Sequence, residues 1–115
     1  MISSDEYEQI RERAEKRREE ERLRRAEQES IERERQEAVA SAIKFFDQLL
    51  RERPLDAFED AGRERFVYID GKTADLVEKT FRDHNWFTSH KHVGADEKKG
   101  LCAHWIVYVH RKGCA

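Results

Sequence analysis

The sequence predicts an α+β protein, in which a long charged N-terminal α-helix precedes a small helix-strand-helix-strand-strand domain with an antiparallel hairpin. Three observations predict this fold class. From Asp5 to Glu37, 23 of 33 residues are charged, and neither glycine nor proline occurs before Pro54. After Glu37 the composition becomes that of an ordinary folded domain. In that part, short β-type runs alternate with one amphipathic helical segment, a pattern typical of helices packed on a small sheet.

The charged segment is expected to form one continuous helix over residues 5–51. Ser3 and Glu6 have the spacing of a capping box, which satisfies backbone donors at a helix start. Opposite charges recur four residues apart, as in Glu12 and Lys16, and each such pair supports a helix. We therefore divide the chain into a charged helical arm, 1–37, and a small α+β domain, 38–115. Residues 38–52 continue the helix as its core-facing part.

Three interpretations of the arm remain open: a solvated single α-helix, a short or partner-dependent coiled coil, and a basic stripe for nucleic acid. Tyr7, Ile10 and Ile31 fall on one heptad seam. The seam positions between Ile10 and Ile31 are mostly charged or polar, which disfavours a stable coiled coil along the whole arm. The arm is therefore interpreted as a docking or oligomerisation element.

From Ala38 an apolar stripe runs along the same helix, formed by Val39, Ile43, Phe46 and Leu50. A stripe of this width faces a core or a partner helix. We expect it to pack against the C-terminal sheet, with an interface between chains as the alternative. The candidate interface residues are Val39, Ile43, Phe46, Leu50, Tyr7, Ile10 and Ile31.

The remaining elements follow from local signals. Pro54 closes the long helix, and a strand is expected over residues 66–69. A helix is expected over residues 74–84, with Thr73 as its N-cap and Asn85 as its left-handed exit. Strands over residues 86–93 and 101–111 flank a polar loop and form the hairpin.

Every histidine and cysteine lies in the last 32 residues, and several alternate along the two hairpin strands. If His92 lies opposite Cys102, then His90 lies opposite His104 and all four side chains share one face. Neutral imidazoles with one thiolate suit zinc, so these four residues are the candidate metal ligands and zinc is the one candidate cofactor. The alternative is a set of half-exposed strand residues with no ligand.

The same residues allow two further interpretations. Histidines with ordinary pKa values near 6.5 could act as a general acid/base pair in a metal-free phosphodiester cleavage. The candidates for such a nuclease are His90, His92, His104, His110 and Lys91. A face that reads nucleic acid is the other interpretation, with Trp86, Phe87 and Tyr108 as stacking residues.

Composition narrows the functional classes. The formal net charge is −2, and residues 1–52 and 53–115 are each close to neutral, which disfavours binding dominated by nucleic-acid phosphates. No run approaches the roughly 18 apolar residues of a membrane span, and no signal-peptide core is found. Two cysteines do not make a disulfide framework, so a cytoplasmic location is expected.

The function expected from these features is a non-enzymatic protein-protein interaction or assembly module, because an extended charged helix serves docking and catalysis does not need it. The arm would dock or oligomerise, and the α+β head would bind a macromolecular partner, as in phage or viral accessory proteins. A protein partner is expected first, a homo-oligomer second, and no membrane. The alternatives are a histidine-dependent ribonuclease or nuclease and a zinc-stabilised binding domain.

Overall fold

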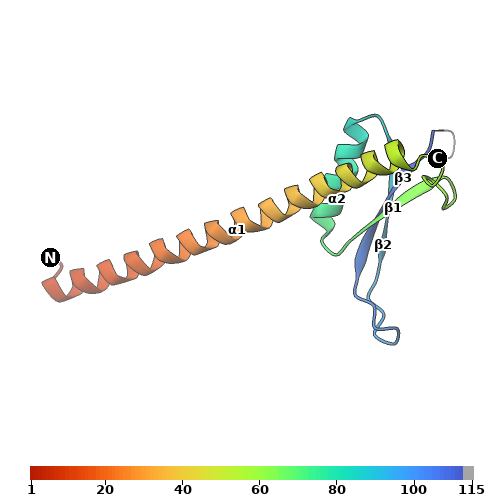
Figure 1. Ribbon diagram of the computed structural model, residues 1–115. Helices are drawn as coiled ribbons and strands as arrows, with labels where there is room; N and C mark the ends of the chain where they lie inside the picture. Colours follow the sequence, from red (N-terminus) through yellow and green to blue (C-terminus); the bar gives the residue numbers. More distant parts are fainter. Residues whose placement is uncertain (113–115) are drawn as a thin grey trace. The chain divides into compact units, whose positions relative to one another are not determined.

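The computed structural model describes residues 1–112 (Figure 1). In chain order the elements are α1 (Ser4–Glu52), β1 (Arg63–Tyr68), α2 (Gly71–Asp83), β2 (Phe87–Val93) and β3 (His104–His110). The α+β fold class and the predicted order of elements are confirmed. Contacts divide the chain into two compact units, Met1–Glu34 and Arg35–Ala115. Among residues 1–112, no helix is long and apolar enough to cross a bilayer.

The N-terminal unit, Met1–Glu34, is helical from Ser4 onward. Ser3 caps this helix, because its Oγ accepts a hydrogen bond from the Glu6 backbone N–H at 3.2 Å. Exposed ion pairs such as Arg11 with Glu15, at 3.1 Å, lie along the surface. Pairs of this kind contribute only a few tenths of a kcal/mol each, so they support the helix without fixing a tertiary contact.

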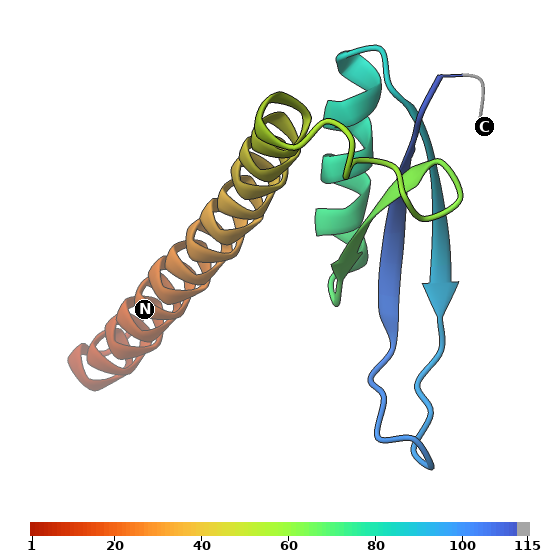
Figure 2. The same cartoon turned by 45° about the vertical axis from the view of Figure 1, so that its right-hand side comes forward.

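The C-terminal unit, Arg35–Ala115, contains a three-stranded antiparallel sheet with strand order β1-β3-β2 (Figure 2). The segment that contains α2 joins β1 to β2, and β3 pairs with both of them. Val107 and Val109 of this central strand are fully buried under the helices. The expected hairpin is formed by β2 and β3.

Phe46 of α1 is the centre of the hydrophobic core, with 2% of its surface exposed. Its ring makes edge contacts with Phe58, Phe66, Phe81 and Trp86, at centroid distances from 4.9 to 6.4 Å. These partners come from the turn after α1, from β1, from the end of α2 and from the turn between α2 and β2. One side chain therefore joins most of the elements of the unit.

The rest of the apolar stripe on α1 also packs against this core. Val39, Ile43 and Leu50 are partly buried against the same cluster, beside the buried Ala42. The expectation that the stripe packs within its own domain is confirmed. Tyr7, Ile10 and Ile31, the other candidate interface residues, are about half exposed in the N-terminal unit.

The start of α2 differs from the expectation, because Asp70 and not Thr73 is its N-cap. The Asp70 carboxylate accepts hydrogen bonds from the Lys72 backbone N–H and from the Thr73 hydroxyl. It also pairs with the Arg35 guanidinium at 2.9 Å, and this contact holds the pKa of Asp70 below its usual value. Gly71 is the first residue of the helix. A glycine is needed at this position because a Cβ would lie 2.9 Å from the Trp105 indole nitrogen.

At its other end, α2 closes as the sequence predicts. Asn85 adopts the left-handed conformation, with φ of 66°, and directs the chain into β2. The Trp86 backbone N–H donates to the Phe81 carbonyl oxygen at 3.1 Å, which satisfies one of the last carbonyls of the helix.

Neighbouring phenylalanines allow a matched test of the core. We expect Phe46→Ala to lower the free energy of unfolding by about 3–5 kcal/mol, the usual cost of emptying a buried phenylalanine site. Phe45→Ala is the control, because Phe45 is 55% exposed and should cost no more than about 1 kcal/mol. Urea unfolding followed by tryptophan fluorescence measures both changes. Equal losses for the two variants would contradict this assignment of the core.

Candidate functional site

The register of the β2–β3 hairpin decides which histidines share a face. His92 pairs with Trp105 and His90 pairs with Val107. The register on which the zinc site depended, with His92 opposite Cys102, therefore differs from the observed one by three residues along β3. The physical cause is the turn: Asp96 and Leu101 exchange two backbone hydrogen bonds of 2.9 Å, which closes a tight loop over residues 97–100.

The Asp96 side chain stabilises this turn, since its carboxylate accepts from the backbone N–H groups of Lys98 and Lys99. Gly100 supplies a positive φ of 66°. Side chains alternate between the two faces of a strand, so a shift by an odd number of residues moves each β3 side chain to the opposite face relative to β2.

The candidate zinc ligands consequently do not converge. His90 and His92 share the helix-covered face of the sheet, whereas His104 points to the opposite face. Cys102 precedes β3 and is exposed, and its backbone carbonyl oxygen lies 2.9 Å from the Nδ1 atom of His104. Within residues 1–112, no group of three or more histidine, cysteine or acidic side chains could hold a metal ion. The expectation of a four-ligand cluster is corrected.

The second face of the sheet carries no helix from residues 35–112 (Figure 2). We call it the open sheet face, and its members follow from strand alternation and register. They are Arg63, Arg65 and Val67 of β1, Phe87, Ser89, Lys91 and Val93 of β2, and His104, Ile106, Tyr108 and His110 of β3.

The open sheet face is cationic and partly apolar. None of its eleven members is acidic, although the whole chain has a net charge of −2. Arg65 and Lys91 on the two edge strands are exposed. Val67 and Phe87, also on the edge strands, are 54% and 58% exposed. Ile106 and Tyr108 of the central strand are nearly covered by their neighbours.

Polar contacts order one end of this face. The Arg63 guanidinium lies over the Tyr108 ring, with its carbon atom 4.0 Å from the ring centroid. The Nε2 atom of His110 lies 2.7 Å from the Ser89 hydroxyl oxygen. Two further atoms, Arg63 Nε and His110 Nδ1, are buried without a hydrogen-bond partner among the described residues. The hydrogen bonding of Arg63 and His110 is therefore incomplete, and packing contributes to holding these side chains in place.

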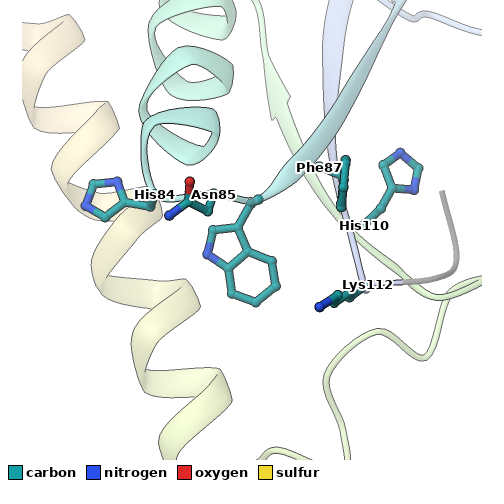
Figure 3. Close-up of a pocket in the computed structure, with 6 residues that line it drawn as sticks. His84, Asn85, Phe87, His110 and Lys112 are labelled. Atoms are coloured by element: carbon teal, nitrogen blue, oxygen red, sulfur yellow. The ribbon is translucent and has the colours of Figure 1, made fainter.

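A pocket of about 500 Å³ lies at this end of the sheet. It is lined by His84, Asn85, Trp86, Phe87, His110 and Lys112. Figure 3 shows Phe87 and His110 side by side at one end of the pocket, near Lys112, with His84 and Asn85 at the other end. Aromatic walls with a few polar groups are the usual lining of a small-molecule site.

The helix-covered face carries a different polar cluster beyond the edge of the core. Glu78 of α2 is 7% exposed, and its Oε2 atom lies 3.0 Å from the Nδ1 atom of His90. Its Oε1 atom accepts a hydrogen bond from the Thr88 hydroxyl at 3.2 Å. The His92 ring lies against the Trp105 ring at a centroid distance of 4.5 Å. A buried carboxylate on Nδ1 orients an imidazole and leaves its Nε2 atom available to a ligand.

The histidines proposed for acid/base catalysis are therefore separated. His104 and His110 share the open sheet face with Lys91 but stand six residues apart on β3, which is roughly 20 Å. His90 and His92 lie on the other face, and His90 has a carboxylate partner.

Sequence reasoning missed Glu78, Arg63 and Arg65. Glu78 follows the spacing of the buried positions Ala74, Val77 and Phe81, which places it on the buried face of α2. The two arginines alternate with Val67, but the expected strand began at residue 66 and excluded them. Comparisons of this chain with protein-family models, with curated proteins and with solved structures gave no match.

The Glu78 contact leads to a prediction about the His90 imidazole. An ionised carboxylate only accepts hydrogen bonds, so in the neutral ring the proton should sit on Nδ1 of His90. Long-range ¹H–¹⁵N NMR spectra distinguish the two tautomers. His92, which stacks on Trp105, is the internal control and should show mainly the Nε2-protonated form that is usual for a free imidazole. A His90 ring protonated on Nε2 would contradict the contact.

Proposed function

We propose that this chain is a non-enzymatic interaction module whose C-terminal unit binds a macromolecular partner through the open sheet face. The N-terminal helical segment serves docking or self-association. The observation that carries the proposal is the composition of the open sheet face, where exposed apolar and cationic side chains lie together without an acidic residue.

Exposed apolar residues on a face of this kind are costly unless a partner covers them. Val67 and Phe87 each expose more than half of their surface, and Ile69 directly after β1 exposes 79%. The helices of the C-terminal unit pack on the other face of the sheet, so they do not cover Val67 and Phe87. Apolar residues rimmed by charged residues are typical of interaction surfaces.

The N-terminal unit supports the second part of the proposal by its composition. Its apolar side chains Tyr7, Ile10, Leu23 and Ile31 are all about half exposed, and charged side chains dominate the rest of its surface. Such a helix is stable through its propensity and ion pairs, and its few apolar residues are free to contact a second helix.

Site-specific photo-crosslinking tests the proposal in the cells that make the protein. A benzophenone amino acid placed at Phe87 should give a covalent adduct with a macromolecule, because this ring lies on the open sheet face. The matched control is the same amino acid at Phe45, a phenylalanine of nearly equal exposure on α1 in the same unit.

The adducts are resolved on denaturing gels with and without nuclease digestion. An adduct at position 87 that is absent or much weaker at position 45 supports the proposal. Labelling confined to position 45, or equal at both positions, would show that the open sheet face is not the binding surface.

A histidine-dependent nuclease is the second candidate, and the Glu78–His90 contact favours it. The buried carboxylate orients His90, whose side chain is 52% exposed and can reach a substrate. If the chain cleaves RNA, His90→Gln should lower the rate by about 10²–10⁴-fold, the usual contribution of a general base. His92→Gln is the control, and a similar loss in that variant would exclude this role for the Glu78–His90 pair.

A further inference from the structure

We infer that the partner of the open sheet face is a single-stranded nucleic acid. Its phosphates would lie along Arg65 and Lys91, and one base would stack on Phe87 at the mouth of the adjoining pocket. This inference rests on the proposed function and names the class of partner.

Charge is the first part of the argument. Arg63, Arg65 and Lys91 give the open sheet face three permanent positive charges, and Lys112 adds a fourth at the pocket. Acidic side chains elsewhere in the chain outnumber these cations, so the net charge of −2 gives no sign of a basic surface. Binding to phosphates depends on the local potential of the surface that meets them.

The second part is the exposed aromatic surface. Phe87 is 58% exposed on the open sheet face and lines the pocket of about 500 Å³. Trp86 also lines this pocket, together with the imidazole of His110 and the ammonium of Lys112. In Figure 3 Lys112 lies near the Phe87 and His110 rings, so a base against the rings would have its phosphate close to a cation.

The combination distinguishes nucleic acid from an acidic peptide. The carboxylates of an acidic peptide would use the cations, but they have no flat ring to stack on the exposed Phe87 side chain. A single strand uses both, because unpaired bases stack on aromatic side chains while the phosphates track basic residues. A duplex would not use the ring, since its bases are already stacked on each other.

Fluorescence anisotropy with the full chain tests this inference. The probes are labelled oligonucleotides of about twelve nucleotides, as single-stranded RNA, single-stranded DNA and the matching duplex. At about 0.05 M salt we expect a single strand to bind with a Kd below about 0.1 mM and more tightly than the duplex. The ratio of the Kd values for the RNA and DNA single strands then shows whether the partner carries ribose or deoxyribose.

Variants of exposed residues locate the binding surface. Arg65→Gln with Lys91→Gln should weaken binding at least about tenfold, and the slope of log K against log salt should become shallower by about 1.4. Phe87→Leu should weaken binding by about 5- to 150-fold, the range for one lost stacking contact, whereas Phe87→Trp should retain it.

Two charge-matched controls keep the total charge of the double variant. Lys72→Gln with Lys79→Gln removes two exposed cations from α2, and Arg18→Gln with Arg25→Gln removes two from the N-terminal unit. Both should bind the single strand within about twofold of the unmodified chain, and all variants should melt at nearly the same temperature.

The outcomes separate this inference from the proposed function. Absence of binding to every oligonucleotide at low salt, or loss of binding only in the N-terminal or α2 controls, overturns the inference. A position-87 photo-adduct that resists nuclease leaves the proposed function intact and likewise overturns the nucleic-acid partner. A nuclease-sensitive adduct together with the expected variant effects supports both.

Discussion

The packing of Phe46 is the contact on which the C-terminal unit depends. A domain of this size can form only one small core, and this ring touches side chains from β1, from α2 and from the turns that follow α1 and α2. All these contacts lie on one face of the sheet, and within residues 35–112 no helix covers the second face. The exposed side chains at the edges of that second face, such as Val67 and Phe87, contribute little to the core, and this makes them informative about function.

The sequence was sufficient for the elements and insufficient for their register. Helical periodicity and the turn at Asn85 correctly predicted α1 and the end of α2, because these signals are local, whereas β3 begins at His104 and not at residue 101. The partner of each hairpin residue depends on the geometry of one short turn closed by Asp96 and Leu101, and composition gives only a polar loop there. A difference of three residues was enough to place His104 on the face opposite to His90 and His92, so it is register and not residue type that separates the candidate zinc ligands.

Total charge does not describe how the charges are distributed over the surface. The even balance of acids and bases argued against a nucleic-acid partner, but strand alternation gathers Arg63, Arg65 and Lys91 on one face and places Glu64 on the other. Glu78 shows the same principle in a helix, where its spacing with Val77 and Phe81 buries a carboxylate against His90 and Thr88. In both cases, the position of a charge in the periodic pattern carried more information than the count of charges.

The position of β3 in the chain has a consequence for synthesis. β1 and β2 pair with β3 and not with each other, and β3 follows both of them in the sequence. While a ribosome is still adding residues before His104, no ladder of this sheet can form, and the apolar surface around Phe46 has no valines of β3 to cover it. The nascent head therefore stays unfolded until its central strand emerges, at which point both edges can pair with it together. Folding of this unit therefore waits for β3, whereas the charged N-terminal helix can form as soon as it leaves the exit tunnel.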